Sequence, residues 1–394
     1  MSEWKEVEFS KMLVDESISY GIVQPGAHTE INSIPIIRVN NIKNGYIKID
    51  DVLKVEPSIE DKYKKTRLKG GELLITVVGS VGECAIVPDS LKGWNVARAV
   101  SVAKIKSEYD TRFIKYAFKT EDIIFQMYGN TNDTVQPTLN LSSLKTLKFN
   151  IPDFPEQTTI ASVLSSLDDK IDLLHRQNAT LAKMAETLFR QWFVEEAKDG
   201  WKEGILDDIL TVKGGSTPIT GEPAYWNGTI HWTSPRDITN LNGIYLFDTE
   251  RKITKLGLSK ISSGLLPKGT LLMSSRAPVG VLAFSEVPIA INQGYIAILD
   301  NKGYSKEFIY LWLKSNIDTV HSFSNGSTFM EISKSTFKTL QLLIPPKQTL
   351  NDFQLLIKPF FEKIKSGQSQ ICTLKALRDT LLPRLMNGEV TVEI

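Results

Sequence analysis

Residues 156–193 read EQTTIASVLSSLDDKIDLLHRQNATLAKMAETLFRQWF, a stretch without an internal glycine or proline. Apolar residues recur in this stretch at alternating steps of four and three. This heptad pattern is typical of a helix that packs along its length against another helix. The residues that we assign to its packed face are Ile160, Leu164, Leu167, Ile171, Leu174, Asn178, Leu181 and Leu188.

A second heptad stretch follows Pro345-Pro346 near the end of the chain. Gly367 and Arg378 interrupt this pattern, and Pro359 is expected to kink the helix or to delay its start. The residues assigned to its packed face are Phe353, Ile357, Phe360, Ile364, Ile371, Leu374 and Leu381.

Two arrangements would bury these apolar stripes. Each helix docks on its own half of the chain as a surface helix, or the two helices pair with each other. Because one stripe closes each half, mutual pairing is the simpler solution, and a globular unit between the helices makes it antiparallel. Asn178 at a packed position either sets the register of the pair or faces solvent.

The sequence also contains a long internal duplication, and such a repeat indicates that the fold consists of two similar units. The matched blocks keep their order. They are Trp4-Lys5-Glu6 with Trp201-Lys202-Glu203, Gly71-Glu72-Leu73-Leu74 with Gly269-Thr270-Leu271-Leu272, and Lys145-Thr146-Leu147 with Lys338-Thr339-Leu340.

Each half starts with short apolar runs that predict strands, which in the first half are Ile36–Val39, Leu73–Val78 and Ala99–Ile105. A short amphipathic helix follows, near Arg112–Met127 and near Lys306–Phe323. We therefore predict an α+β fold of two similar globular domains, related by a pseudo-twofold internal duplication and separated by two long helices that pair as an antiparallel coiled coil. The predicted boundaries are 1–155 and 197–347 for the globular domains, 156–196 for the central helix, and 348–394 for the C-terminal helix and tail.

The composition is that of a globular protein, with 42% hydrophobic and 23% charged residues among 394. Only two cysteines occur, Cys84 and Cys372, which favours a reducing, cytoplasmic setting over a disulfide framework or a zinc site. Neither a signal peptide nor an apolar run near the ~20 residues of a membrane span is evident, so no membrane partner is expected. The net charge of +1 leaves nucleic-acid binding open, because phosphates respond to local charge.

Motifs that would carry catalysis are missing from the sequence. The histidines His28, His175, His231 and His321 lack the spacing of metal ligands, and no phosphate-binding loop is present. Gly79-Ser80-Val81-Gly82 is better interpreted as a tight turn between strands than as a dinucleotide-binding loop. We therefore predict no catalytic residue and no metal site, and favour a binding protein over an enzyme.

A basic segment precedes the strand at Leu73. It is either a solvated loop or a set of contacts to DNA phosphates, and a looser basic stretch at the matched place in the second half favours the phosphates. Its positive residues are Lys62, Lys64, Lys65, Arg67 and Lys69.

Polar residues at matched positions are candidates for reading bases. Arg98 lies opposite Gln293 in the duplication, with Asn292 beside the latter. Arginine recognises guanine through two hydrogen bonds, and asparagine or glutamine recognises adenine in the same way. Different residues at one duplicated position would suit two domains that read different sequences, although a structural role in the strand fits equally well. Arg236 and Arg276 are further candidates.

Several motifs resemble those of type I restriction–modification DNA specificity subunits. The motifs are Ile151-Pro152-Asp153-Phe154-Pro155-Glu156-Gln157 and Leu188-Phe189-Arg190-Gln191-Trp192-Phe193 in the centre, Leu381-Leu382-Pro383-Arg384-Leu385-Met386-Asn387-Gly388-Glu389 at the end, and Gly214-Gly215-Ser216-Thr217-Pro218 and Gly326-Ser327-Thr328 in the second half. The first half departs from this pattern, since it lacks the Gly-Gly-Ser-Thr-Pro opening and its late turn is Gly129-Asn130-Thr131-Asn132-Asp133-Thr134.

The resemblance implies a non-catalytic subunit whose two target-recognition domains each read one part of a split, asymmetric site in double-stranded DNA. The helices would set the spacing between these parts. The implied partners are two modification (methyltransferase) subunits and restriction/translocase subunits. S-adenosylmethionine, ATP and Mg would then bind to those partners, and no cofactor is expected in this chain.

Two other classes of protein remain alternatives. The chain would be a stand-alone DNA methyltransferase or nuclease if its catalytic residues were dispersed along the sequence. It would be a helical scaffold if it bound no DNA.

Overall fold

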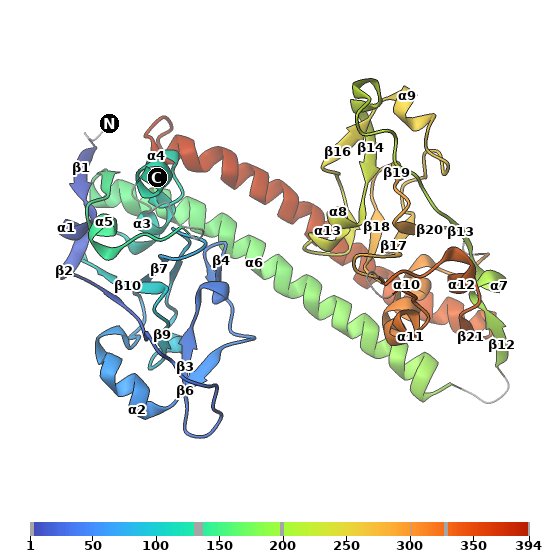
Figure 1. The fold of residues 1–394 in the computed structure, drawn as a ribbon, viewed down its shortest axis with the longest axis horizontal. Helices are drawn as coiled ribbons and strands as arrows, with labels where there is room; N and C mark the ends of the chain where they lie inside the picture. Colours follow the sequence, from blue (N-terminus) through green and yellow to red (C-terminus); the bar gives the residue numbers. More distant parts are fainter. Residues whose placement is uncertain (1–3, 130–136, 198–200, 301, 327–329, 393–394) are drawn as a thin grey trace. The chain divides into compact units, whose positions relative to one another are not determined.

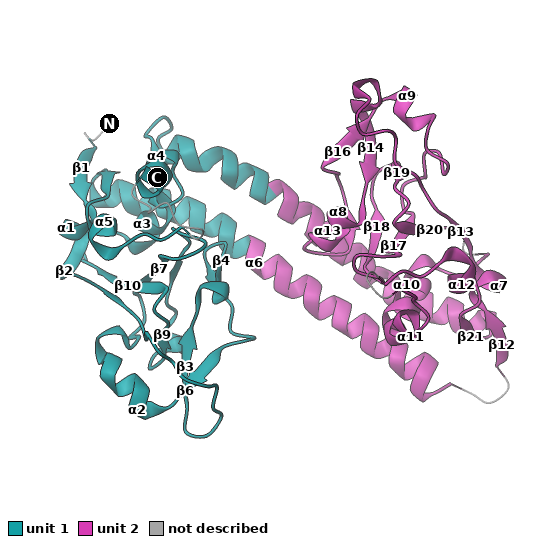
Figure 2. Ribbon diagram, in the orientation of Figure 1, with its two compact units in different colours: residues 1–170, 374–394 teal, residues 171–373 magenta. Residues whose placement is uncertain are grey.

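The computed structural model describes residues 4–129, 137–197, 201–300, 302–326 and 330–392. The chain divides into two compact units, unit 1 with residues 1–170 and 374–394 and unit 2 with residues 171–373 (Figure 2). The division falls within the two long helices, so each helix contributes a segment to each unit. In the expected late turns, 130–134 and 327–328 lie outside the described residues.

Unit 1 is built on a four-stranded antiparallel sheet in the order β2-β10-β7-β8 (Figure 1). A three-stranded sheet, β6-β3-β9, lies away from the long helices and pairs β3 with β9 in parallel. The strands of these sheets are β2 (Leu13–Tyr20), β10 (Val100–Ile105), β7 (Leu73–Thr76), β8 (Cys84–Ile86), β6 (Leu53–Val55), β3 (Ile34–Ile37) and β9 (Asn95–Val96). Two ribbons complete unit 1, β1 (Lys5–Glu8) with β11 (Lys148–Ile151) and β4 (Ile42–Lys43) with β5 (Tyr46–Ile47).

Unit 2 repeats this arrangement. Its sheet in the order β13-β20-β17-β18-β15 matches the four-stranded sheet of unit 1, and β16-β14-β19 again holds a parallel pair, β14 with β19. The strands are β13 (Thr211–Lys213), β20 (Tyr295–Asp300), β17 (Leu271–Ser274), β18 (Leu282–Ser285), β15 (Tyr245–Leu246), β16 (Arg251–Ile253), β14 (Trp226–Thr233), β19 (Ile289–Ile291), β12 (Lys202–Ile205) and β21 (Gln341–Ile344), and the last two form a ribbon. The sheet order therefore follows the duplication in the sequence.

The central strands β7 and β17 are buried on both faces. Leu73 and Ile75 belong to one hydrophobic cluster of unit 1 and Leu74 to another, because successive side chains of a strand point to opposite faces. In unit 2 the same alternation divides Leu271 from Leu272. The expected turn at Gly79–Gly82 joins β7 to β8, and both of its glycines have a positive φ, of 79° and 87°.

Each of the two expected amphipathic helices is in fact a pair of shorter ones, α3 (Thr111–Ala117) with α4 (Glu121–Gly129), and α10 (Lys306–Ser315) with α11 (Ile317–Ser322). Asn316 separates α10 from α11, because its backbone leaves helical geometry. Its side chain donates to the carbonyl oxygen of Trp312 at 2.9 Å. The other short helices are α1 (Phe9–Met12), α2 (Pro57–Glu60), α5 (Leu141–Lys145), α7 (Leu206–Ile209), α8 (Pro235–Thr239), α9 (Lys255–Leu258) and α12 (Lys334–Lys338).

The long helices are α6 (Phe154–Arg190) and α13 (Lys347–Met386). In unit 1 the start of α6 and the end of α13 pack into one hydrophobic cluster together with the sheet, through residues such as Ile160, Leu164 and Leu385. Asp168 of α6 accepts a hydrogen bond from Arg378 Nη1 of α13 at 2.8 Å. Within unit 1, therefore, the helices contact both their domain and each other, and they run antiparallel.

The same holds within unit 2. Phe189 near the end of α6 and Phe353 near the start of α13 belong to one cluster, with ring centroids 6.1 Å apart. Farther along, a Cβ placed on Gly367 would lie 2.5 Å from Asn178 Oδ1, so the helices approach closely at this point. The two positions that interrupt the second heptad pattern, Gly367 and Arg378, thus each face a polar residue of α6.

The assigned packed faces differ in burial along their length. The buried members are Ile160, Leu164, Ile171, Leu174, Phe353, Ile357, Ile364 and Ile371, and the half-buried ones are Leu167, Asn178, Leu181, Leu188, Phe360, Leu374 and Leu381. The delayed start expected from Pro359 is wrong, because α13 begins twelve residues earlier, at Lys347, and continues through the proline.

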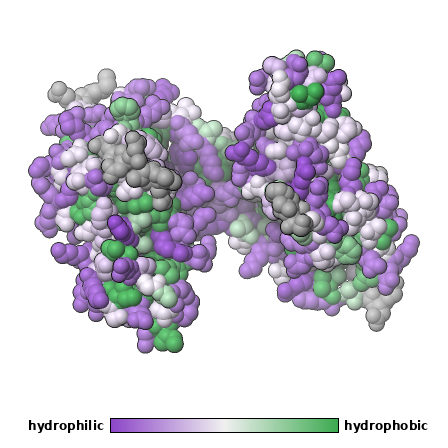
Figure 3. Space-filling model, in the orientation of Figure 1, coloured by the Kyte–Doolittle hydropathy of each residue, from purple (hydrophilic) through white to green (hydrophobic). Residues whose placement is uncertain are grey.

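Among the described residues, no helix is long and apolar enough to cross a membrane. The face drawn in Figure 3 is covered mainly by hydrophilic residues, with smaller hydrophobic patches between them.

Candidate nucleic-acid interface

Polar residues lie where two parallel strands of unit 2 end. The C-terminal ends of β14 and β19 meet at one edge, and Asn292 N donates to the carbonyl oxygen of Thr233 at 3.0 Å. This bond sets Asn292 and Gln293 beside the start of α8, which carries Arg236. Arg236 and Gln293 are exposed, and Asn292 is half-buried with its Oδ1 accepting from Gly294 N. The structure thus brings together residues that lie more than fifty positions apart in the sequence.

The loop from Gly214 to Pro218 forms the other side of this edge. Ser216 N donates to the carbonyl oxygen of Ile291, and Trp232 Nε1 donates to the carbonyl oxygen of Ser216. The approach requires glycine, because a Cβ on Gly215 would lie 1.8 Å from the Ile291 oxygen. The next residue, Thr217, donates its hydroxyl to Gln293 Oε1 at 2.7 Å. We call Thr217, Arg236, Asn292 and Gln293 the polar edge of unit 2.

Replacing Gly215 with alanine is expected to destabilise unit 2 by roughly 1–3 kcal/mol, because the added methyl group meets backbone and forces the loop away from β19. Gly214→Ala is the matched control, since a Cβ there first meets the flexible end of Lys334, at 2.8 Å. Chemical denaturation of the two variants measures the difference. Equal stabilities would contradict the close approach.

Two further cations lie near the polar edge. Arg276 lies near Gln293, because the N–H of the preceding residue, Ser275, donates to the carbonyl oxygen of Gly294. The guanidinium of Arg276 faces Glu331, with Nη1 3.8 Å from Oε2. Lys334, at the start of α12, is exposed and lies next to Gly214. The sequence alone does not single out Lys334, because only the fold brings this residue to the loop.

Unit 1 has an equivalent edge. Ala97 N donates to the carbonyl oxygen of Ile37, which corresponds to the bond from Asn292 to Thr233 in unit 2. Ile22 N donates to the carbonyl oxygen of Val96, which corresponds to the bond from Ser216 to Ile291. A Cβ on Gly21 would lie 2.0 Å from the Val96 oxygen, so Gly21 takes the place of Gly215 although the motif around it differs.

Arg98 occupies the position of Gln293 in this edge, and it is exposed. Among the described residues, no hydrogen bond or ion pair holds its guanidinium. The matching of Arg98 with Gln293 that the sequence suggested is therefore also a structural equivalence.

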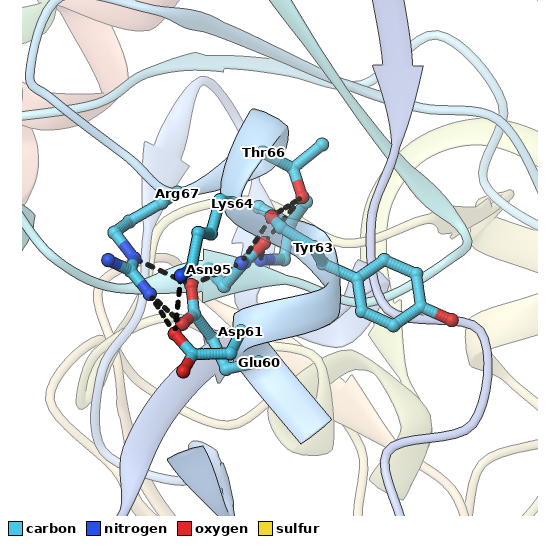
Figure 4. A network of polar contacts seen from close by, with 8 residues as sticks. Glu60, Asp61, Tyr63, Lys64, Thr66, Arg67 and Asn95 are labelled. Atoms are coloured by element: carbon cyan, nitrogen blue, oxygen red, sulfur yellow. Dashed lines mark hydrogen bonds and ion pairs between the residues drawn. The ribbon is translucent and has the colours of Figure 1, made fainter. Parts of the chain in front are cut away.

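A buried polar network underlies the basic segment of unit 1 (Figure 4). Glu60 is fully buried and accepts from Arg67 Nε and from Asn95 Nδ2, each at 2.8 Å. Thr66 donates to Asn95 Oδ1 at 2.7 Å. The hydrogen bond from Arg67 lowers the pKa of Glu60 below its ordinary value, in spite of burial. Because Asn95 lies in β9, the network fixes the basic segment to the strand that leads to Arg98.

This network divides the predicted phosphate contacts into two groups. Arg67 is held by both Glu60 and Asp61, so its geometry favours a structural role over a contact to DNA. Lys62, Lys64, Lys65 and Lys69 are exposed, and Lys64 lies 3.5 Å from Asp61. Asn95, which flanks Arg98, is fully buried and therefore does not reach a base.

In the part of the chain that the structure describes, no three or more His, Cys, Asp or Glu side chains gather in a way that could hold a metal ion. Cys84 is buried, and burial raises the pKa of its thiol well above the ordinary value. Its thiolate is thus disfavoured, and Cys84 is poorly suited to act as a nucleophile.

Comparison with known proteins shows which family the chain resembles. A family model described as the type I restriction modification DNA specificity domain matches residues 21–183 and 198–373. The chain belongs to this family. The two matched regions correspond to the two halves of the duplication.

Individual members of the specificity family are similar over different lengths. The MjaIX specificity subunit of Methanocaldococcus jannaschii is 33% identical over 187 residues, which cover 47% of this chain and 43% of that protein. The HindI specificity subunit of Haemophilus influenzae is 22% identical over an alignment of 468 residues, which covers 99% of this chain and 100% of that protein. This chain thus spans less than half of the first relative and all of the second.

A solved structure has a similar fold. The S subunit of a type I restriction–modification system from M. genitalium superposes with a TM-score of 0.65 at 16% identity, over 100% of this chain and 97% of that one. At this identity the likeness concerns the fold alone.

Proposed function

We propose that this chain is the non-catalytic DNA specificity subunit of a type I restriction–modification complex, and that each half reads one part of a split, asymmetric site. The observation that carries the proposal is the repeated edge, which presents Arg98 in unit 1 and Gln293 in unit 2 at equivalent positions. Arginine suits guanine and glutamine suits adenine in the major groove. One chain with two different edges can recognise a site that is not a palindrome.

The long helices would set the distance between the two parts of the site. Our proposal is that α6 and α13 pair along their length as an antiparallel coiled coil, with a pseudo-twofold relation between the domains. Two contacts within the units support this pairing, the hydrogen bond from Arg378 to Asp168 in unit 1 and the close approach of Asn178 to Gly367 in unit 2. We propose that the chain acts as four parts, two recognition domains (1–155 and 197–347) and two spacer helices (156–196 and 348–394, the latter with the tail).

Membership of the family supports a proposal for the partners. Two modification subunits would bind S-adenosylmethionine and methylate the DNA, and restriction/translocase subunits would bind ATP and Mg, all in the cytoplasm. The exposed lysines of the basic segment would contact phosphates, which positions a protein on DNA without reading its sequence.

The test is to map methylated positions in DNA from cells that express this chain with its modification subunits. A split motif that disappears on deletion of the gene supports the proposal, provided that the purified chain alone neither cleaves nor methylates DNA in the presence of Mg and the methyl donor. Activity of the chain alone would instead identify a stand-alone enzyme. If DNA were not bound even with the modification subunits, the chain would be a scaffold.

Replacing Lys62, Lys64, Lys65 and Lys69 with alanine is expected to weaken binding to the target and to random DNA alike. The slope of log K against log salt should flatten by roughly 0.9 for each phosphate that is no longer neutralised by a lysine. Titration at several salt concentrations measures both effects. The control replaces two lysines that are exposed on strands of unit 1, Lys5 and Lys104, and the change in slope is compared per lysine. Loss of discrimination at one base pair, with an unchanged salt slope, would contradict a phosphate role.

A further inference from the structure

The side chain of Gln293 is exposed, yet it is held in place. Its Oε1 accepts the hydroxyl of Thr217 at 2.7 Å, and the carbonyl oxygen retains a second lone pair. Within the described residues, Nε2 donates no hydrogen bond. The exposed amide therefore retains one donor, Nε2, and one acceptor lone pair on Oε1, the combination that adenine requires at N7 and N6.

Thr217 is itself firmly placed. The preceding residue, Ser216, is bound through its N–H to Ile291 and through its carbonyl oxygen to Trp232, and its hydroxyl accepts from Ser262 N at 2.9 Å. The residue that follows, Pro218, is buried. The hydroxyl of Thr217 thus projects from a rigid loop.

In unit 1 the residue equivalent to Thr217 is different, as is the residue equivalent to Gln293. Val23 follows Gly21 and Ile22 as Thr217 follows Gly215 and Ser216. A valine side chain forms no hydrogen bond. Arg98 carries donors only, so its guanidinium presents the same chemistry in any orientation, whereas the amide of Gln293 presents different atoms in different orientations.

We propose that Thr217 is a positioning residue that holds the amide of Gln293 ready to read an adenine in the half-site of unit 2. The inference rests on the proposed function and adds the residue pair and the base. An unrestrained glutamine loses side-chain entropy when it is fixed. The bond to Thr217 restrains the side chain before DNA arrives, so that less of this entropy is lost on binding the correct base.

The experiment uses the chain assembled with its modification subunits and DNA carrying the wild-type methylated motif. Affinities are measured for that motif and for versions in which each base pair of the half-sites is changed. For Thr217→Val we expect discrimination to fall roughly three- to tenfold at one A·T pair, with unchanged affinity for random DNA. Thr217→Ser retains the hydroxyl and is expected to discriminate like the wild type. Gln293→Ala should lose discrimination at the same pair by tenfold or more.

The thermal midpoint of each variant separates positioning from folding, since the three substitutions are at the surface and should leave it unchanged. The inference is overturned if Thr217→Val discriminates like the wild type, if Thr217→Ser loses as much as Thr217→Val, or if the losses spread over all positions. It is also overturned if Gln293→Ala keeps full discrimination while the wild type reads a split site. If the wild-type complex reads no split site at all, the proposed function fails, and the inference fails with it.

Discussion

Replacing Asp168 with alanine is expected to destabilise unit 1 by about 3–5 kcal/mol. Asp168 is 2% exposed and accepts hydrogen bonds from Tyr116 Oη at 2.7 Å and from Arg378 Nη1 at 2.8 Å. Lys115, which is also buried, has its Nζ 3.9 Å from the same carboxylate. The substitution therefore leaves the buried Lys115 without its nearest counter-charge and a buried hydroxyl without its acceptor, in the region where α3, α6 and α13 meet. It also removes one of the two carboxylates that pair with Arg378, the other being Asp379.

Chemical denaturation measures this loss, with Asp169→Ala as the control because Asp169 is exposed on the same helix. Asp168→Asn, which retains an acceptor but removes the charge, should lose less than the alanine variant. Burial lowers the pKa of Lys115 below its ordinary value, and Asp168 opposes this effect, so the alanine variant should lower that pKa further. A stability change under ~1 kcal/mol for Asp168→Ala would show that the carboxylate does not hold the helices.

Asp168 also illustrates which parts of the fold the sequence can predict. The heptad positions Ile160, Leu164 and Ile171 are recognisable because apolar periodicity is a local signal, and all three are buried. Asp168 falls outside that pattern and reads as a solvent-facing residue. Its burial depends on Tyr116 and Arg378, which lie 52 and 210 residues away in the sequence. Such a site follows only from the tertiary structure.

In the candidate interface, too, the sequence predicts some residues and not others. The match of Arg98 with Gln293 follows from the duplication, because a repeat carries spatial information within the sequence itself. A run of positive charge carries no such information, so it could not separate Arg67, which is paired with Glu60, from the exposed lysines beside it. Lys334 reaches the polar edge through a contact between segments that are far apart in the sequence.

Inserting three heptads into α6 after Lys170, and three into α13 before Leu374, is expected to lengthen the spacing of the DNA half-sites by about nine base pairs. Twenty-one residues add roughly 31 Å of helix, and each base pair advances the duplex by ~3.4 Å. This length is close to a full turn of ~10.5 base pairs, so both domains should meet the same grooves as before. We expect the affinity for the original site to fall at least a hundredfold and the modified motif to carry the longer spacer.

Methylation mapping reads the new spacer directly, and two controls show why the pair of helices, and not one of them, would set it. An insertion into α6 alone displaces Asp168 from Arg378 or Asn178 from Gly367, so it should abolish binding without creating a longer site. A single heptad in both helices adds only ~10 Å, about three base pairs, and turns the second half-site by roughly a third of a turn around the duplex, so weak binding is expected. If the three-heptad chain kept the original spacing, the helices would not measure the DNA, because a rod that lengthens without moving its ends apart cannot act as a ruler.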